Sequence, residues 1–543
     1  MCSIFKKTYL KSLQYYTNKC RQFYQIIPVY YGYFFPYNLL VYIIMAIAKK
    51  TGGIMKNYNM DEKLAAIDAV IKKGPYSDDW DSLSNYSSPK WYDKMRFGIF
   101  IHFGVFSVPA YDNEWYSRNM YVKDSVAYKH HVETYGKHSE FGYKDFIPMF
   151  KAEKFDANKW ITTFKNAGAQ YVVPVAEHHD GFQMYETDLS SYNAADMGPC
   201  KNILGELKEN CEKEGLVFGT SSHRIEHFWF QGVGREFESD ITGEFKRGEL
   251  YWPSVPGPQD FNAIENSCTM TDEYMQDWLV RTCEIIDKYD PNVLYFDWWI
   301  HKVELRPYLK KMLAYYYNRA AERGKEVVVN YKHDTIPFGV AVPDIERGQL
   351  SAQKPFRWQS DTAMAFNSWC YTTQNKYKEA KDILCDLLDI ASKNGTLLLN
   401  IGPKADGTFS DEETKILEDM GKWLSANHEA VFDAKPYKKF GEGPTAVVEG
   451  QFQDGTAKAF SSEDFRFMAG NGCLYIAAMR PSENGEYNVK SFAAKDGFYM
   501  GKILDVECLS EKKKAEYKHT ADGLSISCTT NGDMPVVFKL TIA

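Results

Sequence analysis

Short apolar runs alternate with amphipathic segments between about residues 90 and 435. Six of these runs predict strands, at 97–103, 171–176, 216–220, 293–297, 326–331 and 396–401. Strands that are apolar throughout and separated by helices are typical of a parallel sheet covered on both faces. Their number, and the length of chain that carries them, favour a (β/α) TIM-like barrel over a doubly wound sheet. The predicted fold class is therefore α/β.

Capping signals mark two of the intervening helices. Thr271 precedes an acidic first turn and an apolar stripe in 271–289, so this stretch predicts a helix capped by Thr271. Ser410 and Glu413 stand at the start of 410–424, where their spacing predicts a capping box. Helices with defined starts strengthen the predicted alternation of strands and helices.

The pattern changes after about residue 435. Short runs such as 473–479 and 534–542 are separated by glycine, aspartate and asparagine, and the helical periodicity disappears. Such runs predict a small antiparallel β-sandwich. The predicted organisation is a barrel domain over 55–435 and a C-terminal β-sandwich over 436–543.

Residues 1–54 are predicted to be a leader or a non-native extension. The stretch 25–48 carries no charge and follows a basic segment, which is typical of a signal peptide or a membrane anchor. The alternative is an upstream segment that is not native coding sequence, because Thr-Gly-Gly at 51–53 can be encoded by a purine run of the kind that binds bacterial ribosomes, at a suitable distance before Met55. We expect a cytoplasmic bacterial protein if Met55 is the true start, and an exported one if 1–48 is a signal peptide.

Composition and charge narrow the range of partners. Hydrophobic residues make up 44% of the chain, and the formal net charge of −8 includes no block of five like charges. This argues against nucleic-acid partners and against stable membrane insertion of the barrel. The 11 cysteines form no CxxC pair, and no glycine-rich nucleotide motif follows a strand. We therefore expect no metal and no cofactor.

Polar side chains gather just after the predicted strands. They are, in chain order, His102, His178, His179, His223, Glu226, His227, Asp297, Asn330 and Lys332. The carboxyl ends of barrel strands meet at one face, where barrel enzymes build their active sites. Asp297 ends an apolar run and precedes two tryptophans, a place where an ionised carboxylate needs partners. The sequence therefore predicts an active site around these residues.

One motif offers a rival interpretation. Residues 223–227, HRIEH, match the H-x-x-E-H pattern of inverted zinc metallopeptidases. Zinc binding there requires both histidines on one helical face and a third ligand. The motif directly follows a strand and runs into Phe-Trp-Phe without a helix start, which disfavours this interpretation. A zinc metallopeptidase is kept as the alternative enzyme class.

Four stretches in chain order resemble the α-L-fucosidases of glycoside hydrolase family 29, namely 91–121, 168–193, 293–299 and 395–409. The resemblance implies a retaining exo-glycosidase that removes terminal α-L-fucose from fucosylated oligosaccharides or glycoconjugates by double displacement. It implies no cofactor. A catalytically silent sugar-binding barrel on the same scaffold is the second alternative. The linkage preference and the oligomeric state are left open.

The resemblance also implies catalytic roles. Asp297 stands where the family carries its nucleophile. Glu346, expected on a loop after the sixth strand, is the candidate general acid/base, with Glu226 and Glu114 in reserve. A retaining mechanism places these two carboxyl groups ~5–5.5 Å apart. Arg347, the neighbour of Glu346, is expected to favour the ionised form of that carboxyl group.

Substrate-binding roles follow from the same resemblance. The family positions that hold the fucose hydroxyls and ring are matched by His102, Glu114, Trp115, His178 and His179. Where the family often has tyrosines, this chain has Ser221, Ser222 and His223, so the hydroxyl contact is expected from His223 or a serine. Lys332 stands where many members carry arginine, so a compact charge replaces a planar guanidinium group. Trp298, together with Trp299 and Trp358, is expected to line the slot for the C5 methyl group.

Overall fold

The computed structural model describes residues 56, 58–258, 269–454, 458–496 and 498–543. The predicted leader or extension over 1–54 lies outside the described residues, as does Met55. Among the described helices, none combines the length and the apolar character that a membrane crossing requires.

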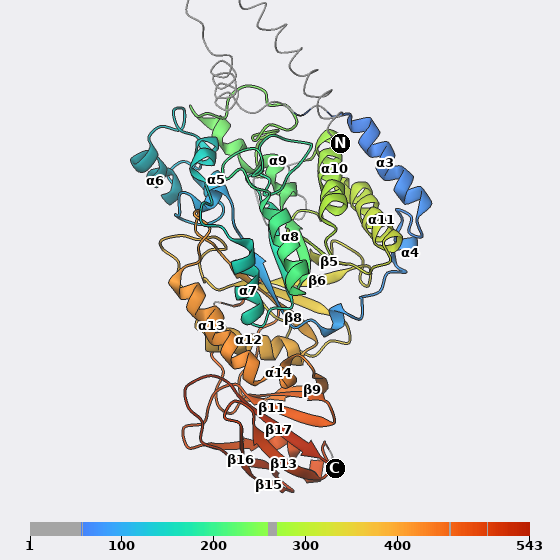
Figure 1. Ribbon diagram of the computed structural model, residues 1–543, viewed down its shortest axis with the longest axis vertical. Helices are drawn as coiled ribbons and strands as arrows, with labels where there is room; N and C mark the ends of the chain where they lie inside the picture. The colour runs from blue at the N-terminus through green and yellow to red at the C-terminus, as the bar shows by residue number, and fades with distance from the viewer. Residues whose placement is uncertain (1–55, 57, 259–268, 455–457, 497) are drawn as a thin grey trace, which may run out of the picture. The chain divides into compact units, whose positions relative to one another are not determined.

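Eight parallel strands of the described chain close into a barrel (Figure 1). They are β1 (Phe97–Ile101), β2 (Tyr171–Glu177), β3 (Val217–Ser222), β4 (Val293–Phe296), β5 (Val328–Lys332), β6 (Val342–Glu346), β7 (Trp358–Ala363) and β8 (Gly395–Ile401). Each strand pairs with the next, and β8 closes the barrel on β1, where Leu399 lies opposite Ile99. The predicted (β/α) barrel is confirmed.

The apolar pattern misses β6 and β7, because their inward positions are polar. Gln359 of β7 accepts hydrogen bonds from the hydroxyls of Tyr92 (3.2 Å) and Tyr171 (3.0 Å). It also donates one to Asp344 of β6 (2.7 Å). These bonds satisfy polar groups that the barrel buries. Glu346, expected on a loop, is instead the last residue of β6.

Helices follow the strands and pack around the barrel. The longer ones are α3 (Met60–Lys73), α6 (Val126–Tyr135), α7 (Ala157–Asn166), α8 (Ile203–Glu214), α10 (Asp272–Tyr289), α11 (Arg306–Glu322), α12 (Ala380–Ser392) and α13 (Asp411–Ala426). Four-residue helices are α4 (Trp80–Leu83), α5 (Tyr116–Asn119), α9 (His227–Phe230) and α14 (His428–Val431). Thr271 caps α10, and Ser410 and Glu413 form the capping box of α13, both as predicted.

Antiparallel sheets form the C-terminal part. The strands are β9 (Lys435–Glu442), β10 (Phe465–Gly470), β11 (Cys473–Ala478), β12 (Glu486–Val489), β13 (Ile503–Cys508), β14 (Lys513–Lys514), β15 (Glu516–Thr520), β16 (Gly523–Ser527) and β17 (Val536–Ile542). Six of them form one sheet in the order β14-β13-β17-β11-β10-β9, and β12-β16-β15 form a second. Tyr487 and Phe538 join the apolar core of these sheets, with ring centroids 4.9 Å apart. The predicted C-terminal β-fold is confirmed, and the domain limits stay predictions.

Between β9 and β10 the chain returns to the barrel. We call residues 449–454 the return segment. The amide of Phe452 donates a hydrogen bond to the carbonyl of Glu346 at the end of β6 (2.8 Å). Asp454 accepts a hydrogen bond from the hydroxyl of Thr362 in β7 (2.6 Å). The return segment therefore lies beside the carboxyl ends of two barrel strands.

Candidate active site

A cavity of about 260 Å³ lies at the carboxyl ends of the barrel strands. It is lined by Phe100, His102, Glu114, Trp115, His178, His179, His223, Glu226, Tyr295, Asp297, Trp298, Glu346, Asp361, Trp369 and Phe452. The predicted site residues that do not line it are His227, Asn330, Lys332, Trp299 and Trp358. A larger cavity, of about 1100 Å³, lies at the amino ends of the strands around Arg96 and Arg357. Barrel enzymes keep that face for stability, so the smaller cavity is the candidate active site.

Asp297 directly follows β4 and is held by two histidines. Its Oδ2 lies 3.0 Å from Nδ1 of His223 and 3.5 Å from Nε2 of His179. Because a carboxylate only accepts, Nδ1–H of His223 donates to Asp297, and Ser221 Oγ lies 3.0 Å from the other ring nitrogen of His223. Burial alone would raise the pKa of Asp297, but the hydrogen bond from His223 and the charge of Lys332 outweigh it. The pKa is held below its ordinary value, and Asp297 is ionised.

Glu346 has the opposite environment. The residue is 8% exposed, and the indole of Trp298 donates a hydrogen bond to its Oε2. Burial raises the pKa of Glu346 to about 7, with the nearby Asp297 acting in the same direction and Lys332 against it. A carboxyl group with this pKa carries a proton for much of the time near neutral pH.

Lys332, predicted to contact the substrate, does not line the cavity. Its ammonium group is buried and lies 2.9 Å from Asp344, 3.0 Å from Asp361 and 3.1 Å from Glu346. These contacts make it the cation that faces Glu346. The expectation that Arg347 plays this part is wrong.

The guanidinium group of Arg347 points to other partners. It donates to the carbonyls of Ala365 and Phe366 (3.3 Å each) and lies 3.5 Å from Asp454 of the return segment. Arg347 therefore connects the return segment to the loop after β7. The cation that contacts Glu346 is Lys332.

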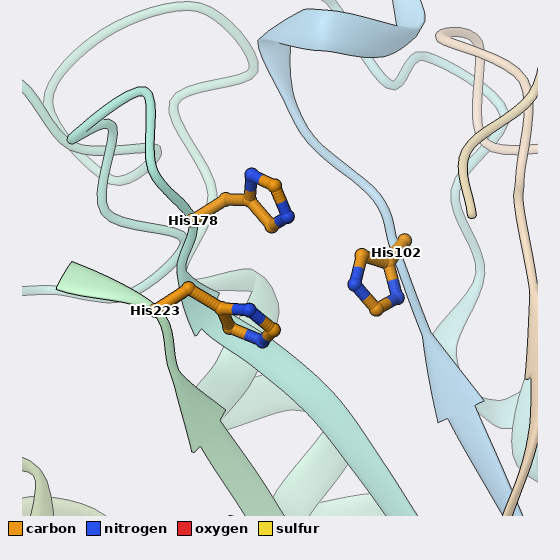
Figure 2. Close-up of side chains that lie close together, drawn as sticks. All are labelled: His102, His178 and His223. Carbon is orange, nitrogen blue, oxygen red and sulfur yellow. The ribbon is translucent and has the colours of Figure 1, made fainter. Parts of the chain in front are cut away.

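Three histidines from successive strand ends converge on the cavity. His102 follows β1, His178 follows β2 and His223 follows β3 (Figure 2). The ring centroid of His102 is 5.4 Å from each of the other two, which lie 4.8 Å apart. Burial holds the pKa of His102 and of His178 well below the ordinary value. As neutral rings, these two can each donate and accept a hydrogen bond, which suits sugar hydroxyls.

The same histidines form the groups best suited to a metal. One atom from each of His102, His178 and His223 lies within 4.8 Å of the others, and His179, His223 and Asp297 form a second such group. Within the described part of the chain, His227 belongs to neither group. Its Nδ1 lies 2.7 Å from the carbonyl of His179, and it begins α9 after a 3₁₀ turn. The HRIEH motif thus lacks the paired histidines of a metallopeptidase.

Two further carboxyl groups line the cavity. Glu226 is 2% exposed, its Oε2 has no hydrogen-bond partner and lies 3.8 Å from Nε2 of His179. Burial and the charge of Asp297 raise the pKa of Glu226 well above its ordinary value. Glu114 accepts a hydrogen bond from the amide of Trp369 (2.9 Å), and burial raises its pKa as well.

Aromatic side chains complete the walls. Trp115 and Trp298 line the cavity as predicted, whereas Trp299 and Trp358 do not. Trp299 packs on Trp229, with ring centroids 5.0 Å apart, and Trp358 is buried with its indole bonded to the carbonyl of Lys393 (3.1 Å). The methyl-slot role expected of these two tryptophans therefore has no support.

Several lining residues escaped the sequence analysis. Tyr295 and Asp361 stand at inward positions of β4 and β7, so strand alternation back from Asp297 would have found Tyr295. Trp369 and Phe452 lie on connections far from any strand pattern. No sequence signal marked them.

An ionised carboxylate, a carboxyl group that titrates near neutrality and a set of neutral imidazoles at a barrel mouth define a glycoside hydrolase site. A sequence model of the family described as alpha-L-fucosidase matches residues 63–429. The tissue alpha-L-fucosidase of Mus musculus is 28% identical over 77% of this chain and 83% of its own. A putative alpha-L-fucosidase of Caenorhabditis elegans is 31% identical over 67% of this chain and 70% of its own.

Comparison with solved structures points to the same family. Thermotoga maritima alpha-fucosidase in complex with fucose has a TM-score of 0.68 and 25% sequence identity, over 86% of this chain and 100% of that one. The chain belongs to the α-L-fucosidase family, and it is a glycoside hydrolase. This confirms the resemblance of the four stretches and leaves the metallopeptidase alternative without support.

Proposed function

We propose that the protein is a retaining exo-α-L-fucosidase that removes terminal α-L-fucose from fucosylated oligosaccharides or glycoconjugates. The observation that carries the proposal is the pair of carboxyl groups with opposite pKa shifts in one cavity, Asp297 downward and Glu346 upward. Two carboxyl groups whose environments push their pKa values apart are the parts that double displacement needs.

In the first step, Asp297 attacks the anomeric carbon and Glu346 gives its proton to the departing glycosidic oxygen. The hydrogen bond from His223 keeps Asp297 ionised and aimed, because it fixes one carboxylate oxygen. The bond from the sugar carbon to the leaving oxygen breaks as the bond to Asp297 forms. The products are a covalent fucosyl enzyme and the released alcohol.

In the second step, Glu346 acts as a base. Once it has lost its proton it is a carboxylate, stabilised by Lys332 at 3.1 Å and by the indole of Trp298. It removes a proton from a water molecule that attacks the anomeric carbon, and Asp297 leaves. Two inversions at one carbon give fucose of retained configuration.

Other residues that line the cavity with Asp297 and Glu346 bind the fucose. The neutral His102 and His178, with His179 and Glu114, offer donors and acceptors to ring hydroxyls. Trp115 supplies an apolar surface for the ring. A cavity of about 260 Å³ suits one terminal sugar, which favours exo action.

Glu346 is a better acid than the two reserve candidates. The Oε2 of Glu226 has no hydrogen-bond partner, and burial together with the charge of Asp297 raises the pKa of Glu226 well above its ordinary value, although Arg118 acts in the opposite direction. A carboxyl group in this environment favours the protonated form, whereas the second step needs a carboxylate. Glu114 is committed to the amide of Trp369. Glu346 alone among the three contacts Lys332, which allows both protonation states.

The configuration of the first-formed fucose tests the proposal. Proton NMR during hydrolysis of an aryl α-L-fucoside should show the α-anomer before it equilibrates with the β-anomer. First appearance of the β-anomer would mean direct displacement by water and would overturn double displacement. Absence of any fucose release would support the silent sugar-binding alternative.

A further inference from the structure

Phe452 lines the cavity although it belongs to the return segment and not to the barrel. Phe452 is 53% exposed. Its ring stacks on that of Trp298, with centroids 5.7 Å apart and planes inclined by 12°. The two rings therefore present one apolar surface at the edge of the cavity. Apart from the C5-methyl contact expected of Trp298, the fucose contacts described above do not use this surface.

The position of Phe452 is fixed by its backbone. Its amide donates to the carbonyl of Glu346 (2.8 Å), and the side chain of Gln451 accepts from the amide of Glu346. Phe452 has a φ of 57°, a left-handed conformation that non-glycine residues seldom adopt and that surrounding contacts must maintain. The ring is thus held at the rim and is not a chance surface group.

The neighbours of this ring pair show which part of a substrate it faces. The indole of Trp298 donates to Oε2 of Glu346, the group proposed to protonate the departing oxygen. An acid in that role touches the leaving group, so the surface beside it lies on the leaving-group side. The histidines that suit the fucose hydroxyls come from β1, β2 and β3, whereas Glu346 ends β6.

We propose that Trp298 and Phe452 form a leaving-group subsite, which stacks against the apolar face of a pyranose attached to fucose. This inference rests on the proposed function and deepens it. Aromatic rings provide rigid apolar area for stacking. Binding energy gained from the leaving group can lower the activation free energy of the reaction, and not only KM. The subsite makes glycans, rather than small fucosides, the preferred substrates.

Two substrates test the subsite. α-L-Fucosyl fluoride has no ring in its leaving group, whereas a fucosyl disaccharide, the best hydrolysed of a linkage panel, has one. Phe452→Ala should lower kcat/KM on the disaccharide about three- to tenfold, as expected for a lost aromatic contact, and leave the fluoride within about twofold. Phe452→Leu should show a similar loss on the disaccharide, because it keeps apolar bulk without the ring. Phe452→Tyr should restore activity.

Phe338→Ala is the matched control. Phe338 is 69% exposed and lies at the larger cavity at the amino ends of the strands, so its loss should change neither substrate. Equal losses on both substrates for Phe452→Ala would mean that the residue only positions Glu346, and no loss on either would also overturn the subsite. Failure of the unaltered enzyme on both substrates would instead refute the proposed function. Thermal melting of each variant confirms that it folds.

Discussion

At the scale of single residues, neighbours decide what each carboxyl group in the cavity can do. Asp297 accepts a hydrogen bond from His223, which stabilises its charge. Glu346 is buried close to that charge, which stabilises its protonated form in spite of Lys332. Below about pH 7 the pair therefore holds one proton, which Glu346 carries.

Replacing Asp297 by alanine should lower kcat on an aryl fucoside at least about a thousandfold, because no covalent intermediate can form. Fucose affinity, measured by calorimetry, should stay largely intact, since the hydroxyl-binding groups remain. Added azide should restore part of the activity and give fucosyl azide of inverted configuration. Turnover close to that of the unaltered enzyme would remove Asp297 from the role of nucleophile.

Glu346→Ala should lose far more activity on fucosyl oligosaccharides than on an aryl fucoside, whose phenolate leaves without protonation. On the aryl substrate the second step becomes limiting, so stopped-flow absorbance should show a burst of phenol. Azide should then speed turnover and give a product of retained configuration. Glu226→Ala and Glu114→Ala are the controls and should show no burst. A burst with Glu226→Ala alone would transfer the acid/base role to Glu226.

The pH profile of kcat/KM tests the charge assignment. Activity should fall as the pH rises through about 7, because Glu346 then loses the proton it must donate. On the acid side activity should persist to below about pH 4, because the pKa of Asp297 lies below its ordinary value.

Trp298→Phe moves the alkaline limb of that profile. The indole hydrogen bond favours the charged form of Glu346, so its removal should raise the pKa of Glu346 and shift the limb to higher pH. Trp91→Phe, which removes only a bond to the carbonyl of Glu326, should leave the profile unchanged. An unmoved limb in Trp298→Phe would contradict the assignment of that limb to Glu346.

At the scale of elements, the sequence predicts strands wherever apolar residues fill both faces. The apolar pattern predicts β1 to β5 and β8. It therefore also predicts that the histidines and Asp297 stand at strand ends. It fails for β6 and β7, whose inward residues Asp344, Gln359 and Asp361 are polar and satisfied only across the barrel. For the same reason Glu346 was expected on a loop. Contacts such as Phe452 with Trp298 join distant stretches, which no local pattern contains.

Gln359 and its hydrogen-bond partners form a buried polar layer inside the barrel, and we expect its disruption to lower the stability of the fold. Gln359→Leu removes the bonds made with Tyr92, Tyr171 and Asp344 and leaves their polar atoms buried. The free energy of unfolding should fall by at least about 2 kcal/mol in urea denaturation. Gln374→Leu, at an exposed position, should change it by less than about 0.5 kcal/mol. Equal stabilities of the two variants would show that the layer is replaceable by apolar packing.

At the scale of the whole molecule, buried polar contacts join the barrel to the C-terminal sheets. Arg466 of β10 lies 2.5 Å from Asp389 of α12, which also pairs with Lys393 (2.6 Å). The indole of Trp423 in α13 donates to the carbonyl of Pro535 (2.8 Å). Separating the two parts would remove these buried contacts, so neither part should unfold alone.

Calorimetry tests this coupling. Heating should give a single transition, and fucose at about 100 times its dissociation constant should stabilise the whole of it by about 2.7 kcal/mol. Arg466→Met, which leaves Asp389 with one cation, should lower the transition temperature of the entire molecule. Two transitions, of which fucose shifts only one, would show that the barrel and the sheets unfold independently.

The return segment has a consequence for how this enzyme diversifies. Barrel enzymes ordinarily change their chemistry through the loops that connect their own strands and helices. Here an aromatic group at the cavity rim, Phe452, is supplied by a stretch that contributes no strand to the barrel and no residue to its polar interior. With the subsite proposed above, substitutions in 450–453 should change which glycans are trimmed without changing a strand of the barrel. In the proposed subsite, the surface that receives the leaving group is thus shared between Trp298, which follows a barrel strand, and Phe452, which lies outside the barrel.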